Sequence, residues 1–223
     1  MEKTVSFSVY GRLNIKFKTW HIFLSLTILY LLIYFTLQNL IMTRQVYYSL
    51  LGSRMETYRI DDYINFVKKI SIWGYLSQPL LLWLKIAVVS FLIQLPLMIR
   101  YTDIPFKSIF RVITLANLAA AASATTKIFY LFVLPVESIN QRTLDFTPLS
   151  VTNFLDKTKY SAASWGFLSS LNLFEVLWIL IVYYGLVNIC KLKKDDSMLL
   201  VLGVWTFIAV FQFALISYIS KVL

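Results

Sequence analysis

Long runs of apolar residues alternate with shorter polar connections along the whole chain. The runs cover residues 20–42, 76–99, 112–134, 168–190 and 198–220. Each is close to the ~20 residues that a helix needs to cross the ~30 Å hydrocarbon core of a bilayer. The pattern predicts an all-α membrane protein with an amino-terminal tail at residues 1–19 and one membrane domain at residues 20–223, a bundle of five transmembrane helices.

Two connections between the apolar runs are longer than the others. In residues 43–75, Asp61 is expected to cap a short helix that ends near Ile70 and lies flat on the membrane surface, since its apolar residues share one face. The connection at residues 135–167 is more polar. It fits either a plain return loop or a lid over a substrate site.

Composition agrees with a membrane environment. Hydrophobic residues make up 59% of the chain and charged residues only 14%, which is far from the balance of a soluble domain. The net charge of +10 is also compatible with nucleic-acid binding, but the basic residues flank the apolar runs and form no separate stripe. The predicted partner is therefore the lipid bilayer and not a nucleic acid.

The distribution of positive charge predicts the orientation of the helices. The denser group of basic residues consists of Lys3, Arg12, Lys16, Lys18, Arg100, Lys107, Arg111, Lys191, Lys193 and Lys194. Short cytoplasmic connections are enriched in lysine and arginine. This group is therefore expected in the cytoplasm, with the amino terminus inside and the carboxy terminus outside.

Polar residues inside the apolar runs are the candidate functional site. They are Lys85, Lys127, Asn172, Glu175 and Gln212. The ionisable members lie ~10 to 14 Å from the outer ends of their runs at a rise of 1.5 Å per residue. Glu175 is expected to pair with Lys85 or Lys127, and Lys85 is preferred because it lies deeper and cannot reach the headgroups. The layer fits either a structural salt bridge or a hydrated cavity for an ion or an anionic substrate.

Small residues predict close helix packing. Ala116, Ala120 and Ala124 follow one another at intervals of four in the third run, and Gly185 lies in the fourth. Small side chains on one face let helix backbones approach closely in lipid.

Catalytic and metal-binding patterns are not found in the sequence. The single histidine, His21, and the single cysteine, Cys190, lie at the ends of apolar runs, and no phosphate-binding loop or nucleophile elbow is present. We expect a non-enzymatic protein with no cofactor and no metal.

The last third of the chain resembles the Yip (Ypt-interacting protein) family. The likeness rests on Asn172-Leu173-Phe174 at the start of a helix, Trp178, Gly185, the basic turn from Lys191 to Asp196, and Trp205, and it covers residues 149–220. It implies five membrane helices with the amino terminus inside. Members of the family in eukaryotes associate with small GTPases and have longer cytosolic amino-terminal regions. The short tail here counts against a GTPase partner and favours a bacterial inner-membrane relative over a eukaryotic endomembrane protein.

Two functions are compatible with the sequence. The first is an accessory or scaffold subunit that packs against other membrane proteins in a larger assembly. The second is a small-solute or ion permease that uses the polar layer. An odd number of spans and the lack of an inverted repeat favour the first.

Overall fold

The computed structural model describes residues 18–100 and 102–222. Residues 1–17 of the predicted tail lie outside the described part. Regular structure in the described residues is helical, apart from one isolated β-bridge between Ser150 and Asn172. The prediction of an all-α fold is confirmed.

Four helices of the described chain are long and apolar enough to cross a membrane. They are α1 (Thr19–Thr36) with the π-helical turn η1 (Leu37–Ile41), α3 (Thr57–Ile99), α4 (Phe106–Val133) and α8 (Lys194–Val222). These helices fit an integral membrane protein with several spans. A further apolar helix, α7 (Leu173–Asn188), has only 16 residues.

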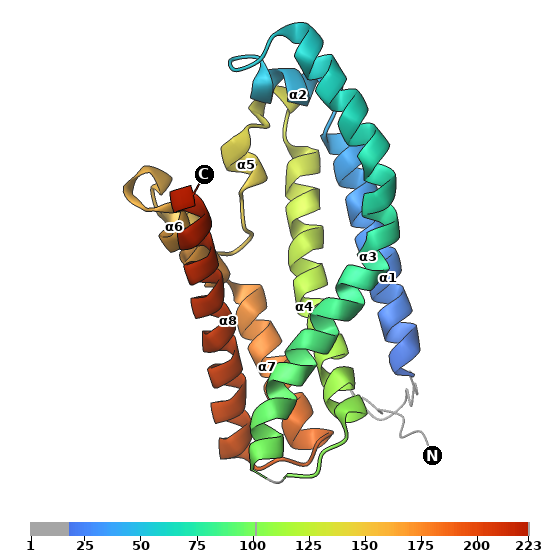
Figure 1. The fold of residues 1–223 in the computed structure, drawn as a ribbon, viewed down its shortest axis with the longest axis vertical. Helices are drawn as coiled ribbons and strands as arrows, with labels where there is room; N and C mark the ends of the chain where they lie inside the picture. Colours follow the sequence, from blue (N-terminus) through green and yellow to red (C-terminus); the bar gives the residue numbers. More distant parts are fainter. Residues whose placement is uncertain (1–17, 101, 223) are drawn as a thin grey trace.

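The helix α3 corrects the expectation for the first long connection. It runs for 43 residues without interruption, which corresponds to ~64 Å. The segment Asp61–Ile70 is therefore the first part of α3 and not a separate helix on the membrane surface. Figure 1 shows α3 bent near its middle, where Pro79 removes a backbone donor.

The first part of α3 packs against the short helix α2 (Arg44–Leu51). Tyr47 on α2 and Ile60 and Ile64 on α3 are buried together there. Arg44 holds the two helices together with hydrogen bonds of 2.6 Å and 3.0 Å from its guanidinium to Asp61 Oδ1. Tyr48 donates to the same oxygen at 2.7 Å.

The fourth apolar run is also different from its prediction. Residues 168–190 do not form one helix, because α6 (Ala162–Ser170) ends at Leu171 and α7 begins after Asn172. The side chain of Asn172 accepts a hydrogen bond from the backbone N–H of Glu175 at 2.9 Å. This satisfies one of the free donors of a helix start.

The helix α4 lies at the centre of the molecule (Figure 1) and carries the main core with α3, α7 and α8. Ile109, Val112, Ile113 and Ala116 on α4 are fully buried. A Cβ added to Gly185 of α7 would lie 2.5 Å from Val112 Cγ1. The missing side chain therefore lets α7 approach α4 closely.

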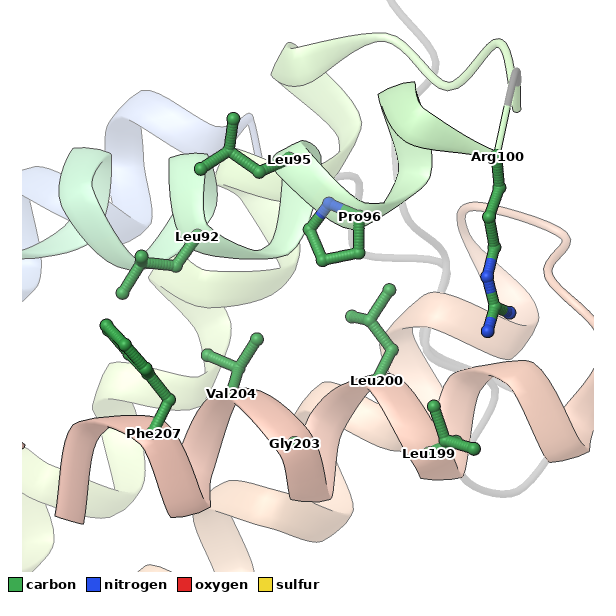
Figure 2. Close-up of a pocket in the computed structure, with 9 residues that line it drawn as sticks. All are labelled: Leu92, Leu95, Pro96, Arg100, Leu199, Leu200, Gly203, Val204 and Phe207. Carbon is green, nitrogen blue, oxygen red and sulfur yellow. The ribbon is translucent and has the colours of Figure 1, made fainter. Parts of the chain in front are cut away.

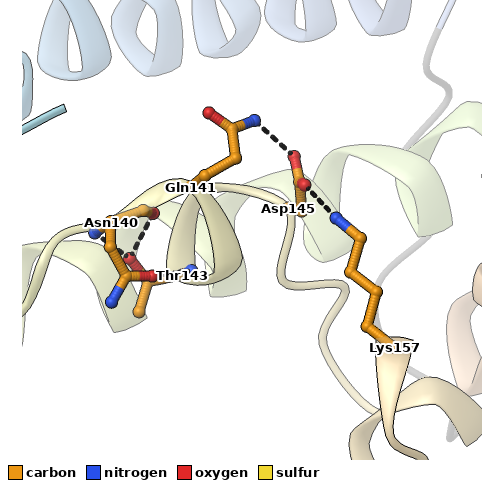
Figure 3. A network of polar contacts seen from close by, with 5 residues as sticks. All are labelled: Asn140, Gln141, Thr143, Asp145 and Lys157. Carbon is orange, nitrogen blue, oxygen red and sulfur yellow. Dashed lines mark hydrogen bonds and ion pairs between the residues drawn. The ribbon is translucent and has the colours of Figure 1, made fainter. Parts of the chain in front are cut away.

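The second long connection is ordered by short helical turns and polar contacts. Its elements are η2 (Val136–Ser138), α5 (Gln141–Leu144), η3 (Val151–Phe154) and η4 (Lys157–Lys159). Figure 3 shows Asn140 and Thr143 exchanging hydrogen bonds at the start of α5. Asp145 accepts hydrogen bonds from Gln141 at 3.2 Å and from Lys157 at 2.7 Å. These contacts link α5 to η4 within the connection.

The long helices place opposite ends of the described chain at opposite ends of the bundle. In Figure 1, α1 begins at the end where α3 and α7 finish, and α8 finishes toward the end that carries α2. Arg100, at the close of α3, pairs with Asp196 in the first turn of α8 at 2.9 Å. The basic turn before α8 therefore lies beside the end of α3.

Candidate functional site: a polar cavity between four helices

A cavity of about 150 Å³ lies among α3, α4, α7 and α8, with Ser170 at the end of α6 also lining it. Its polar and aromatic lining consists of Lys85, Asn117, Ser170, Glu175, Trp178, Trp205 and Gln212. Ala120 and apolar residues of α3, α4 and α8 complete the wall. The structure thus brings Lys85, Glu175 and Gln212 of the predicted polar layer to one cavity.

Asn117 supplies the least satisfied polar group of this cavity. Its side chain is 1% exposed. Its Nδ2 donates to the Ile113 carbonyl of the same helix at 2.8 Å, but its Oδ1 has no hydrogen-bond partner among the described residues. A buried acceptor without a partner destabilises a protein by ~1 to 3 kcal/mol. A bound solute or water that donates to Oδ1 would remove this penalty.

Lys85 and Glu175 face the cavity with opposite charges. Each is the charged group that acts electrostatically on the other, yet they do not form a direct ion pair within 4 Å among the described residues. Lys85 lines the cavity from α3 and Glu175 lines it from α7. The indole N–H of Trp205 is directed at the Glu175 carboxylate.

The break between α6 and α7 sets the position of Glu175. Because α7 begins after Asn172, Glu175 lies in the first turn, where the free backbone N–H groups and the helix dipole favour a negative charge. The break itself is held by backbone hydrogen bonds, from Val151 to the Leu171 carbonyl at 3.1 Å and from Leu173 to the Leu149 carbonyl at 3.2 Å. Leu149 adopts a positive φ of 52° to make this contact.

Asn172 has a different place from the one predicted for it. It was expected on a continuous helix, one turn before Glu175, as a member of the polar layer. In the structure it caps α7, and its Nδ2 donates to the Ser169 carbonyl at 3.1 Å. Asn172 therefore positions Glu175 and does not line the cavity.

Lys127 is separated from the other members of the predicted layer. The charged group that acts on it is Asp145 in the second long connection, and not Glu175. It does not line the cavity. The five predicted residues thus divide into three cavity residues, one helix cap and one lysine at a different site.

The predicted packing residues also have distinct environments. Ala116 is fully buried in the main core, and Gly185 is the close contact between α7 and α4 described above. Ala120 lines the polar cavity, while Ala124 is half-buried. The α4 wall of the cavity, formed by Ile113, Asn117 and Ala120, therefore extends along α4 past the buried Ala116.

Asn117, Trp178 and Trp205 are cavity residues that sequence reasoning did not assign to a site. Asn117 lies inside an apolar run, and a polar amide in that position is a signal of function or buried hydrogen bonding. The two tryptophans gave no such signal, since aromatic residues are common in membrane helices. Their convergence on Glu175 depends on how the helices pack.

Comparison with protein-family models, curated proteins and solved structures found no match for this chain. Among the described residues, histidine, cysteine, aspartate and glutamate do not gather in a group that would hold a metal ion. The chemistry of the cavity is that of a cation, an anion, amide groups and indole rings. This set of groups can bind a small molecule that both donates and accepts hydrogen bonds.

Proposed function

We propose that this chain is a multi-pass membrane protein that binds a small polar solute between α3, α4, α7 and α8. The observation that carries the proposal is Asn117, which lines the cavity and has a buried Oδ1 without a hydrogen-bond partner among the described residues. A dry cavity would leave this acceptor without a partner, and would leave Lys85 and Glu175 poorly solvated without a direct ion pair. Solute binding or hydration gives all three groups a partner.

The broken fourth apolar run supports the proposal. Transporters often bind solutes at membrane helices that are interrupted, because the break frees backbone groups and a helix end inside the membrane. Here the break at Leu171–Asn172 places the start of α7 and Glu175 at the cavity. The volume of about 150 Å³ holds roughly five molecules of the size of water, at ~30 Å³ each.

The proposed membrane arrangement has five passes, with α6 and α7 together making the fourth. In Figure 1, α1, α4 and α8 run in one direction and α3 and α7 in the other, which supports an odd number of passes. With the basic turn before α8 in the cytoplasm, the amino terminus is inside and the carboxy terminus is outside. A bacterial inner membrane is the proposed location.

Cysteine reactivity tests whether water reaches the cavity. In a Cys190→Ser background, Ala120→Cys places a thiol in the cavity wall. Only the thiolate reacts with methanethiosulfonate reagents, and thiolates form where water has access. We expect Ala120→Cys to react with the ethylammonium reagent in reconstituted protein.

Two matched variants on α4 serve as controls. Ala116→Cys lies in the buried apolar core, and Ala122→Cys lies on an exposed face of the same helix that lipid would cover. Both should react far more slowly. Equal rates for Ala120→Cys and Ala122→Cys would mean that the cavity is dry, and would overturn the solute-binding proposal.

An accessory subunit is the second proposed function. It is favoured by the start of α7, where Asn172 caps a helix that begins with Leu173-Phe174, as the Yip-like resemblance implies for the corresponding helix. Purification in a mild detergent tests it. Stable membrane partners in fixed stoichiometry would support an accessory role, whereas a homogeneous chain without partners would count against it.

A further inference from the structure

A second hollow in the molecule has a different chemistry from the polar cavity. It is an apolar groove of about 380 Å³ between the last part of α3 and the first half of α8. Figure 2 shows Leu92 and Pro96 on one side and Leu200, Val204 and Phe207 on the other. The groove shares no lining residue with the polar cavity.

Gly203 gives the groove its depth on the α8 side. A Cβ added there would meet no atom within 4 Å. By contrast, a Cβ on Gly185 would meet Val112 at 2.5 Å. Gly203 of α8 therefore leaves open space beside the helix, whereas Gly185 of α7 allows two helices to pack in direct contact.

Arg100 provides the only charged group among the residues that line this groove. It stands at the end of the groove where α3 finishes (Figure 2). Its Nη1 bonds to Asp196 at 2.9 Å, and both side chains are about half exposed, at 52% and 46%. A guanidinium has five N–H donors, so the pairing with one carboxylate leaves donors that can bind an anion.

The basic turn before α8 adds positive charge at this end. The ion pair to Asp196 brings Arg100 beside the start of α8. This helix begins at Lys194, directly after Lys191 and Lys193 in the chain. These lysines exceed the two acidic residues of the first turn, Asp195 and Asp196. The end of the groove is therefore attractive to an anion that carries an apolar tail.

We propose that this groove holds an acyl chain of an anionic phospholipid, with the phosphate at Arg100. A volume of about 380 Å³ accommodates roughly a dozen methylene groups if each occupies about the volume of a water molecule, ~30 Å³. The lining is apolar apart from Arg100, so an acyl chain would be held there by van der Waals packing. Arginine binds phosphate oxygens in a bidentate manner, and basic pockets between membrane helices bind anionic headgroups.

Lipid retention by the purified full chain tests the proposal. The protein is delipidated in mild detergent and titrated with dioleoyl-phosphatidylglycerol or dioleoyl-phosphatidylcholine, and bound lipid is counted by native mass spectrometry. We expect one retained phosphatidylglycerol at concentrations at least ten-fold below those needed for phosphatidylcholine. Equal retention of the two lipids would overturn the proposal. Retention of free oleate, added in a parallel titration, without retention of either phospholipid would overturn it as well.

Substitution of Gly203 separates the groove from the general lipid surface. Gly203→Leu places a side chain in the groove at a position where a Cβ meets no atom within 4 Å, so the fold should be kept and phosphatidylglycerol retention should fall at least ten-fold. Ala214→Leu adds the same side chain to an exposed part of α8 outside the groove and should leave retention unchanged. An equal effect of the two variants would contradict binding in the groove.

A second pair of variants tests the role of the arginine. Arg100→Gln and Asp196→Asn each remove the same ion pair, but only Arg100→Gln removes the phosphate ligand. The preference for phosphatidylglycerol should be lost in Arg100→Gln and kept in Asp196→Asn. Loss of the preference in both variants would assign the effect to the ion pair and refute a phosphate site at Arg100.

Discussion

Lys85 and Glu175 bring opposite charges to one polar cavity from two different helices. Their opposite charges at similar depth predicted that they lie near each other, and the structure places both at one cavity. The expected direct ion pair does not form within 4 Å among the described residues. The break before α7, which sets the position of Glu175 in the first turn of that helix, was not apparent from the apolar run.

Charge removal at Lys85 and Glu175 should show weak coupling. Lys85→Met and Glu175→Gln should each lower stability, and the double variant should recover ~0.5 to 1 kcal/mol, the low end for interacting pairs because water screens an exposed lysine. Unfolding in detergent measures the four free energies. Lys127→Met combined with Glu175→Gln should be additive, since Asp145 is the charge that acts on Lys127. Coupling of Lys127 equal to that of Lys85 would contradict the cavity geometry.

Asn117 is expected to reduce the stability of the solute-free protein. Its Oδ1 is buried without a partner, so Asn117→Leu should raise the free energy of unfolding by ~1 kcal/mol when no solute is bound. Asn39 provides the contrast, because its amide donates to the Tyr75 hydroxyl at 2.9 Å. Asn39→Leu should be neutral or destabilising in the same thermal unfolding assay. Destabilisation by Asn117→Leu would indicate that Oδ1 is already satisfied in the purified protein.

At the scale of elements, helix type followed from the hydrophobic pattern but helix ends did not. The acidic and basic residues of Asp61–Lys69 interrupt the hydropathy of α3, yet none of them breaks a helix, and α3 continues through them. The opposite holds in the fourth run. There the hydropathy is continuous, but Asn172 followed by Glu175 is a typical helix start, with a side-chain cap and an acid three positions later.

The side-chain cap of α7, Asn172, should contribute measurably to the free energy of unfolding. Asn172→Ala removes the acceptor for the Glu175 N–H and should lower the free energy of unfolding by ~1 to 2 kcal/mol. Asn172→Asp keeps a cap oxygen and should be less harmful. Asn188→Ala, at the exposed last position of α7, should change little. If Asn172→Ala matched Asn188→Ala in thermal unfolding, the break would not depend on this cap.

The contact between α2 and the first part of α3 should depend on pH. We place this part of α3 outside the membrane, since the predicted span begins at residue 76. The hydrogen bonds from Arg44 and Tyr48 hold the pKa of Asp61 below its usual range. A lowered pKa in the folded state gives stability that is fully present above the unfolded value of ~3.9 and is lost as pH falls through the folded value.

Asp61→Asn should therefore melt at a lower temperature than the parent protein at neutral pH, and this difference should shrink below about pH 4. The adjacent Asp62 makes no ion pair or side-chain hydrogen bond among the described residues. Asp62→Asn should have little effect at either pH. A difference for Asp61→Asn that stays constant down to pH 3 would contradict an ionised Asp61 as the source of the effect.

At the scale of the whole molecule, hydropathy predicted several membrane helices, and four such helices are present in the described residues. The assembly of the cavity was not predictable in the same way. Hydropathy counts apolar residues along the chain, whereas the cavity depends on Gly185 bringing α7 against α4 and on α6 ending early. Both are properties of packing between segments far apart in the sequence.

The orientation of the molecule in the membrane can be tested by cysteine labelling. In a Cys190→Ser background, single cysteines replace Asp62 on α3, Lys159 in the second long connection, and Asp195 in the first turn of α8, all exposed positions. The positive charge near Lys191–Lys194 should keep Asp195→Cys in the cytoplasm. An impermeant maleimide added to intact cells should label Asp62→Cys and Lys159→Cys but not Asp195→Cys.

All three should react after the membrane is opened with detergent, which confirms that each thiol is reactive. Labelling of Asp195→Cys alone in intact cells would invert the proposed orientation, and labelling of Asp62→Cys without Lys159→Cys would mean that α4 does not cross the membrane.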